Sequence, residues 1–420
     1  MREPTKRSEE LSQHIIFRSF FSLAIALRLL LVVFVPFGQR VEHRLEGLND
    51  EPAHFNYVKF LAAHHSLPIQ RGTVKDPGAF ERNDFEYYQP PLYYIIGAFF
   101  FAAFGERNAF YCCRLFSCLC GILTVFLISS IVYKSAPDQL LRHYALLFAA
   151  LFPTHAYFCA MISNDALSWL FATLIVYEVI AIGAPQSILH LSWKRSMRLI
   201  FYLAAGMLTK SSMAIFFFVI AAYFFIGSIG TRKPSTALQG CGIVGIAAIV
   251  AFPWYFRNLL IYHSLFALNM GFGQPSHCLS TLQAITGFIE KTIHYFWFPM
   301  QHGAPGRVGT KICNIIGGAI LVVQGIAAAE YLLRTKRPSF DVMLLTFVLI
   351  LTTAFYISLN TSHSEPEGRF LLPGFSAIVF YFSAPAVGLF NRIGRQHCAL
   401  WAAIVSSMYP YWFLFFTKAA

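Results

Sequence analysis

Long apolar runs alternate with short polar segments along most of the chain. Most runs approach the ~20 residues that an α-helix needs to cross a bilayer. Lys and Arg form small clusters at alternate ends of these runs, which is typical of residues that stay on the cytoplasmic side. The pattern predicts an all-α polytopic membrane protein with about 11 spans. The predicted spans are 15–37, 110–133, 144–161, 167–182, 199–208, 213–229, 242–255, 315–333, 342–359, 370–390 and 399–416.

The basic clusters also predict the orientation of the chain. Arg2, Lys6, Arg7 and Arg18 lie before or within the first run and place the N-terminus in the cytoplasm. The apolar segment 92–104 is too short to cross comfortably, so we expect an interfacial or re-entrant helix there. Were it to cross, every later basic cluster would fall outside.

The resulting topology is one membrane domain over residues 1–420, with the C-terminus outside. Two long loops lie on that external side. Residues 38–104 form the first loop, and residues 258–311 form the second.

Composition supports a membrane protein and argues against a nucleic-acid partner. Apolar residues make up 57% of the chain and charged residues only 12%, more apolar surface than a soluble protein of 420 residues could hide. The net charge of +12 is dispersed among topology signals, so we expect anionic lipid headgroups as its partners. The nine Cys show no paired zinc-binding spacing. Four of them, Cys112, Cys113, Cys118 and Cys120, lie in one apolar run and are expected to act as small apolar residues.

Two adjacent carboxylates, Asp50 and Glu51, open a short amphipathic helix in the first external loop. Pro52 marks the helix start, because proline is favoured in the first turn. A cap and a favourable dipole contact, together worth ~0.5–1 kcal/mol, would explain one carboxylate but not both. We therefore predict a catalytic centre here.

The topology places further charged residues on the same external side, mostly near span ends, where a charge costs less than at the bilayer centre. Carboxylates and cations together at one membrane face suggest a site for an anionic, lipid-attached substrate. These residues are Asp50, Glu51, Glu86, Asp165, Lys210, Arg257, Glu365, Glu367 and Arg369.

Five short motifs, in order and all on the external side, resemble polytopic glycosyltransferases of the GT-C type. Within that class they are similar to the family 39 branch, which includes protein mannosyltransferases and lipid A aminoarabinose transferases. The motifs lie at 50–55, 89–94, 208–211, 253–258 and 367–373.

The resemblance implies a GT-C-like helical bundle with interfacial helices in the first external loop. It implies transfer of a hexose or pentose from a polyprenyl-phosphate donor, outside the cytoplasm and with inversion at the anomeric carbon. The acceptor would be a lipid, glycan or protein. We expect an integral protein of a bacterial inner or plasma membrane, with its active site outside.

Residue roles follow from the motifs and from the chemistry of glycosyl transfer. A carboxylate can take the proton of an acceptor hydroxyl, and Asp50 is the expected general base. Glu51 and Asp165 are expected to orient the acceptor or bind a cation, although Asp165 could instead cap the helix that follows it.

Three basic residues, Arg369, Lys210 and Arg257, are expected to bind the donor phosphate. The alternative for all three is an interfacial anchor whose charged end reaches the headgroups.

Glu86, Gln89 and His54 are candidate acceptor or substrate contacts. A divalent cation is a possible cofactor, with Glu51, His54 and Asp165 as candidate ligands, because mixed carboxylate and imidazole groups suit such ions. His155 could join them as a ligand. The alternative for both histidines is a hydrogen-bonded packing residue, which is the more common role of a single His beside an interfacial helix. The sequon at Asn360 is attributed to chance.

Two other functions would use the same charged residues. A transporter or flippase for lipid-linked saccharides would bind without reacting, but carriers place charges near the bilayer midplane rather than at one face. A ligase or polymerase with a polyprenyl-diphosphate donor would differ in the donor alone.

Overall fold

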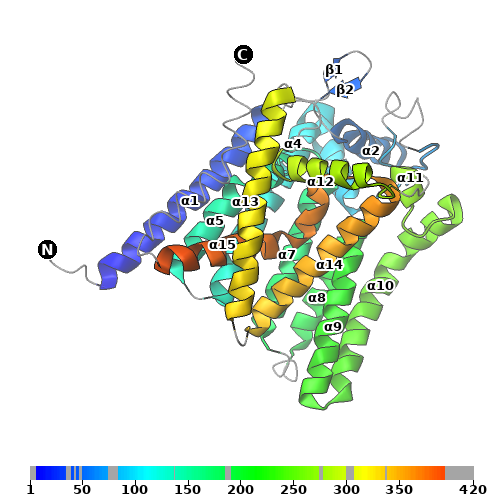
Figure 1. Cartoon of the computed structure of the whole chain (residues 1–420). Helices are drawn as coiled ribbons and strands as arrows, with labels where there is room; N and C mark the ends of the chain where they lie inside the picture. The colour runs from blue at the N-terminus through cyan, green and yellow to red at the C-terminus, as the bar shows by residue number, and fades with distance from the viewer. Residues whose placement is uncertain are drawn as a thin grey trace.

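The structure, a computed structural model, describes residues 6–34, 39–41, 44–46, 50–73, 84–136, 138–184, 191–273, 278–298, 307–335 and 338–392. It is a bundle of helices with one two-stranded hairpin, whose strands β1 (Gln39–Val41) and β2 (Arg44–Glu46) are antiparallel (Figure 1). The helices are α1 (Lys6–Phe34), α2 (Glu51–His64), α4 (Leu92–Ser135), α5 (Gln139–Leu151), α6 (Pro153–Phe158), α7 (Asn164–Ile182), α8 (Trp193–Met207), η2 (Ser211–Met213), α9 (Ala214–Thr231), α10 (Pro234–Tyr262), α11 (Leu268–Phe272), α12 (Leu282–Trp297), α13 (Arg307–Arg334), α14 (Phe340–His363), η3 (Gly368–Gly374) and α15 (Phe375–Arg392).

The predicted all-α membrane architecture is confirmed. Within the described residues, 8 helices are long and apolar enough to cross a membrane, and each matches a predicted span. The predicted span 144–161 is broken into α5 and α6, and 199–208 forms part of the shorter helix α8. The predicted span 399–416 lies outside the described residues. The count of 11 therefore stays a prediction.

The expected separation between 92–104 and 110–133 takes the form of a sharp break within α4. Gly105 has a φ of 73° and a ψ of 169°, a conformation that only glycine adopts without strain. The segment before the break packs on α2, where Gly97 lies against the side chain of Val58. A side chain at position 97 would collide there, so Gly97 allows the close approach of the two helices.

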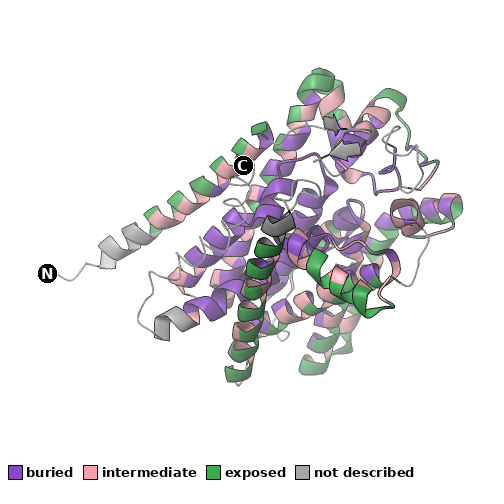
Figure 2. Ribbon diagram, turned by 45° about the horizontal axis from the view of Figure 1, so that its top comes forward, coloured by how far each residue is buried: buried purple, intermediate pink, exposed green. Residues whose placement is uncertain are grey.

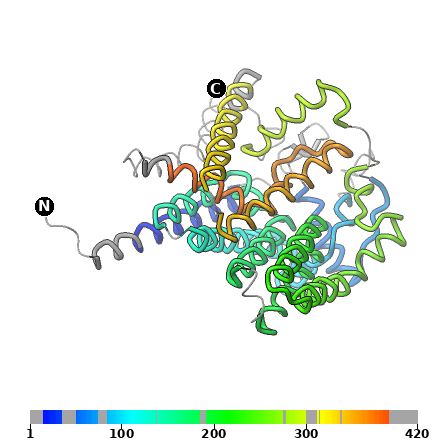
Figure 3. The backbone as a smooth tube through the Cα atoms, turned by 60° about the horizontal axis from the view of Figure 1, so that its bottom comes forward, coloured from blue at the N-terminus to red at the C-terminus, as the bar shows by residue number. Residues whose placement is uncertain are grey.

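Buried segments gather in the middle of the bundle (Figure 2), and α7 and α15 are among the most deeply buried helices. In the most apolar stretch of α7, 83% of the residues are buried. In that of residues 368–388, which cover η3 and most of α15, the buried share is 89%. The corresponding share for α13 is 6%, so α13 faces outward over most of its length. Helices α8, α9 and α10 lie side by side at one edge of the bundle (Figure 3).

Helices α2, α11 and α12 all lie near one end of the bundle (Figure 1). At that end η3 touches the last turn of α12 backbone to backbone, because Gly368 has no side chain to collide with Phe296. The hydroxyl of Thr154 on α6 donates to the carbonyl of Phe296 at 2.6 Å. This end of the molecule therefore brings together segments from the first, middle and last thirds of the chain.

Candidate active site

Asp50 immediately precedes α2, and its side chain makes no capping hydrogen bond. The carboxylate is instead turned toward Arg369, whose Nη2 donates to Oδ2 at 2.7 Å. The Asp50 side chain is 24% exposed, which leaves it within reach of a substrate. The capping alternative therefore does not explain why an acid stands at this position.

Arg369 is the centre of the charged cluster. Its guanidinium is paired with Asp50, lies 3.7 Å from Asp165 and also contacts Glu367, two residues earlier. The ring of Phe158 on α6 lies 5.1 Å below its Cζ atom, within cation–π range. The 3₁₀ helix η3 carries Arg369 into this position, and neighbours from two distant parts of the chain, Asp50 and the segment with Phe158 and Asp165, fix its orientation.

Asp165 and Lys210 form the second ion pair of the cluster, at 2.5 Å between Oδ1 and Nζ. Both side chains are buried. The N-cap of α7 is Ser163, whose hydroxyl accepts a hydrogen bond from the Asp165 N–H. The capping alternative for Asp165 is therefore wrong, because Ser163 occupies that position and the carboxylate points at two cations.

The cations decide the charge state of Asp50. Burial by itself would raise the pKa of this carboxyl, but the nearby Arg369 and Lys210 cations hold the pKa below its usual value. Asp50 is therefore a carboxylate at neutral pH.

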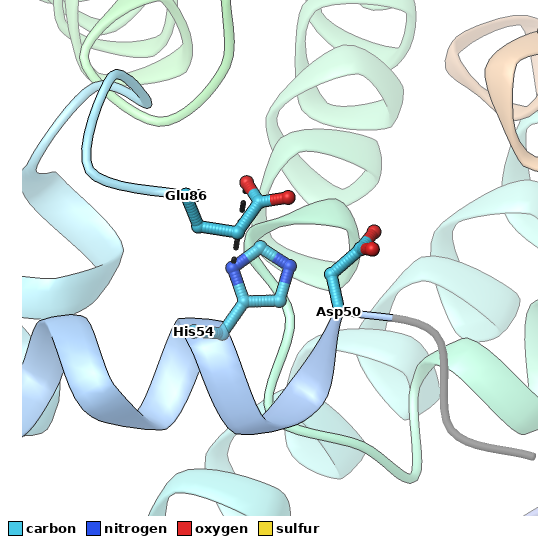
Figure 4. A group of neighbouring side chains, drawn as sticks. All are labelled: Asp50, His54 and Glu86. Carbon is cyan, nitrogen blue, oxygen red and sulfur yellow. Dashed lines mark ion pairs between the residues drawn. The ribbon is translucent and has the colours of Figure 1, made fainter. Parts of the chain in front are cut away.

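Asp50, His54 and Glu86 form a second grouping on the other side of Asp50 (Figure 4). One ligand atom from each lies within 4.8 Å of the other two, and Nδ1 of His54 is 4.0 Å from Glu86. Burial lowers the pKa of His54 to about 4, so the imidazole is neutral at pH 7. The same Nδ1 atom is 2.7 Å from the hydroxyl of Tyr94, so part of the alternative, a hydrogen-bonded imidazole, also holds.

Glu86 is the residue that makes this group of three a candidate cation site. Its side chain is buried, and Oε2 has no hydrogen-bond partner. Burial and the nearby Asp50 raise the pKa of Glu86 well above its usual value. Once Glu86 gives up its proton, two carboxylates and a neutral imidazole match the ligands that divalent metal ions take, so the residues present fit such an ion. Of the predicted ligands Glu51, His54 and Asp165, only His54 belongs to this group.

Glu51 has different partners from Asp50 and is fully buried. Arg114 on α4 donates to both of its oxygens, at 2.7 and 2.6 Å, and the Ile162 N–H donates to Oε1 at 2.8 Å. Arg114 also donates to the carbonyl of Val32 on α1. The pair thus joins α1, α2, α4 and the segment that leads to Asp165.

Gln89 is fixed between two elements. Its Nε2 donates to the Tyr88 hydroxyl at 2.9 Å, and its Oε1 accepts from Asn164 at 3.3 Å. Because Asn164 opens α7, Gln89 ties the loop that carries Glu86 to the helix that carries Asp165.

Arg257 has different partners from the other two predicted phosphate ligands. It donates to the carbonyl of Pro68 and lies 4.8 Å from the ring of Trp254. The structure therefore brings Arg369 and Lys210 together and gives Arg257 a separate place.

Several residues of the site were not predicted. Arg114 and Phe158 had no assigned role, and Glu367 was grouped with the other charges expected outside but was given no partner. An arginine within an apolar span is a signal that could have identified Arg114. Asn360 of the sequon is fully buried, and its side chain donates to the Tyr356 carbonyl, so it is not accessible in the folded chain.

Residues 88–256 match the model of the dolichyl-phosphate-mannose-protein mannosyltransferase family, a segment that contains the motifs at 89–94 and 208–211. Solved structures are similar over almost the whole chain. The oligosaccharyltransferase of Archaeoglobus fulgidus with Zn and sulfate has a TM-score of 0.56 and 16% identity, over 94% of this chain and 52% of that one. The chain has the fold of a GT-C glycosyltransferase.

Two further structures share this GT-C fold. AglB from Archaeoglobus fulgidus, with an inhibitory peptide and a dolichol-phosphate, has a TM-score of 0.57 and 14% identity, over 95% of this chain and 55% of that one. ArnT from Cupriavidus metallidurans, bound to undecaprenyl phosphate, has a TM-score of 0.55 and 12% identity, over 91% and 62%. This chain thus spans about half to three-fifths of these proteins. No curated protein sequence matches it.

Proposed function

We propose that the protein is an integral membrane glycosyltransferase that moves a sugar from a polyprenyl-phosphate donor to an acceptor at the extracytoplasmic face. The observation that carries this proposal is the convergence of Asp50, Asp165, Lys210 and Arg369, which come from four distant segments. The fold supports it, and similar structures hold dolichol-phosphate or undecaprenyl phosphate.

Asp50 is the general base of the proposed reaction. It is ionised and partly exposed, so its carboxylate can accept the proton of an acceptor hydroxyl. The hydroxyl oxygen forms the bond to the anomeric carbon as the bond from that carbon to the phosphate oxygen breaks. Attack from the face opposite the leaving group inverts the configuration, and the polyprenyl phosphate departs with the electron pair.

Arg369 and Lys210 stabilise the departing phosphate in this proposal. A fixed guanidinium and ammonium favour the charge that grows on the leaving group in the transition state. Both are already paired with carboxylates in the cluster. An incoming phosphate must therefore share these cations with Asp50 and Asp165, which places the phosphate directly beside the base.

A divalent cation would be held by Asp50, His54 and Glu86. The cluster holds the carboxylates of Asp50, Asp165 and Glu367 against two cations, before the phosphate adds its own negative charge. When bound, the ion would supply positive charge that offsets this excess. Asp50 takes part in both proposals, so transfer that persists in EDTA would assign it to proton transfer alone.

Glu51 holds the site together rather than reacting. All its described contacts are with Arg114 and the Ile162 backbone, and it is inaccessible to an acceptor. In this proposal the pair fixes Asp50 on α2 with respect to the segment that leads to Asp165.

The test uses the purified full chain in lipid nanodiscs with radiolabelled polyprenyl-phosphate hexoses and pentoses. We expect labelled sugar to leave the lipid and, with a suitable acceptor extract, to join a new product of inverted configuration. Movement of intact labelled donor across a proteoliposome membrane without cleavage would show a flippase instead. Release from a diphosphate donor alone would assign the ligase or polymerase class.

A further inference from the structure

The break between α5 and α6 leaves backbone carbonyls without helical partners inside the bundle. Pro153 has no N–H and therefore cannot bond the carbonyl of Ala149, and it favours an extended conformation at Phe152. The helix ends at Leu151, so the carbonyl of Ala150 also lies in the unpaired last turn. In a membrane protein, unpaired buried carbonyls are costly because no water is present to satisfy them.

Arg28 on α1 supplies hydrogen bonds to these carbonyls. It is fully buried, and its guanidinium donates to the carbonyl of Ala150 at 2.8 Å and to that of Ala149 at 3.2 Å. It also donates to the carbonyl of Ala24 within its own helix. A buried arginine inside a span needs such partners, and here the partners are the groups that Pro153 deprives of theirs.

His155 continues the hydrogen-bonded chain on α6. Nη2 of Arg28 donates to its Nδ1 at 2.9 Å. A guanidinium can only donate, so Nδ1 carries no proton and the ring proton lies on Nε2. Nε2 is 3.6 Å from the Sγ atom of Cys159, which places the N–H beside a sulfur acceptor. Both His155 and Cys159 are fully buried.

This chain of contacts reaches the charged cluster around Arg369. The His155 ring stacks on Phe375 with centroids 4.6 Å apart, and Phe375 directly follows the 3₁₀ helix that carries Arg369. One turn further along α6, the Phe158 ring lies under the guanidinium of Arg369. A shift of α6 would therefore move two supports of Arg369 together.

We propose that Arg28, His155 and Cys159 form a hydrogen-bonded relay that locks the broken α5–α6 segment and thereby positions Arg369. The three are positioning residues, because none of them contacts Asp50, Asp165 or Lys210 in the contacts described. Only the identity of the anion that Arg369 receives rests on the proposed function; the relay itself does not.

The first measurement follows alkylation of Cys159 by N-ethylmaleimide in the purified full chain, with peptide mass spectrometry to separate it from the other cysteines. Arg28→Lys keeps the charge but cannot bond two carbonyls and an imidazole in one plane. We expect alkylation at least tenfold faster than in the wild type. Arg18→Lys is the matched control, since Arg18 lies exposed on the same helix, and should match the wild type.

The second pair of variants separates hydrogen bonding from packing. In His155→Asn the side-chain oxygen can take the place of Nδ1 as acceptor for Arg28, whereas His155→Leu offers no acceptor. We expect His155→Asn to protect Cys159 to within about threefold of the wild type and His155→Leu to lose protection at least tenfold, an energy of about 1.4 kcal/mol or more. Equal alkylation in the two variants would overturn the relay, even if Arg28→Lys does not fold.

The positioning of Arg369 is tested by binding of undecaprenyl phosphate, measured by native mass spectrometry on the same samples. We expect His155→Leu to weaken binding about tenfold and His155→Asn to retain most of it. Unchanged binding in His155→Leu, with Cys159 exposed, would overturn the link to Arg369. If the wild type does not bind this lipid, the proposed donor class fails, and Cys159 protection alone decides the relay.

Discussion

Asp50 and Glu51 are neighbours in the chain with opposite surroundings. The oxygens of Glu51 receive hydrogen bonds from two N–H groups of Arg114 and one of Ile162, and the side chain is fully buried. Asp50 is partly exposed and shares Arg369 with Asp165 and Glu367. Both carboxylate oxygens of Glu51 are hydrogen-bonded within the protein, whereas Asp50 belongs to a group with more carboxylates than cations.

This difference separates structure from chemistry at the start of α2. Successive residues of a helix point about 100° apart, so adjacent acids face different neighbours. A saturated buried pair has no capacity left for a substrate, whereas an unbalanced cluster gains by receiving a cation or by sharing its charges with a ligand. Mutation of Asp50 should therefore reduce activity, whereas mutation of Glu51 should reduce stability.

Asp50→Asn should give the largest effect, and only on activity. The amide keeps the size of the side chain but cannot accept the acceptor proton, so transfer should fall by about 10²- to 10⁴-fold. The measurement is sugar transfer from the polyprenyl-phosphate donor, with the thermal unfolding midpoint recorded on the same sample. Turnover close to the wild type in a folded Asp50→Asn protein would remove Asp50 from its assigned role.

Glu51→Gln should instead lower stability. Removal of one charge strands Arg114 in the interior, and breaking a buried pair costs about 3–5 kcal/mol. Thermal unfolding in detergent measures this loss. The double variant Glu51→Leu, Arg114→Leu removes both charges and should recover much of the stability. A Glu51→Gln protein as stable as the wild type but inactive would return Glu51 to a catalytic role.

Divalent cations should stabilise the protein through Glu86. At a free Mn²⁺ or Zn²⁺ concentration of 100 times its dissociation constant, the stabilisation should be about 2.7 kcal/mol. Glu86→Gln should abolish this shift. Glu106→Gln is the matched control, because Glu106 is exposed and paired with Lys59 at 3.2 Å. An equal shift in both variants would place the ion elsewhere.

The sequence predicted the fold class and the convergence of distant charges, because both depend on patterns that survive without side-chain geometry. Hydrophobic run length identifies helices, and the distribution of Lys and Arg assigns Asp50, Asp165 and Arg369 to one side. The direction of Glu51 could not be predicted in this way. It depends on Arg114, 63 residues away, and on the rotation of α2 against α4.

The metal grouping and the break in α5 show the same limit. Glu86 was predicted as a substrate contact, but its place beside His54 depends on how the loop before α4 folds back on α2. Pro153 could have indicated the break between α5 and α6, whereas its partner Arg28 lies 121 residues from Ala149. Local sequence rules identify where the backbone loses hydrogen-bond partners, and tertiary packing decides which residue replaces them.

The smallest predicted effect distinguishes Arg369 from Arg257, two arginines that the sequence assigned to the same phosphate. Arg369→Lys keeps a positive charge but loses the planar fork that bonds Asp50 while facing Asp165 and Glu367. The donor KM should rise about tenfold, an energy of ~1.4 kcal/mol. Arg257→Lys should change the donor KM less than threefold, because its guanidinium bonds the Pro68 carbonyl outside the cluster. Equal rises in the two variants would show that both arginines reach the phosphate, and the distinction drawn from their partners would then be wrong.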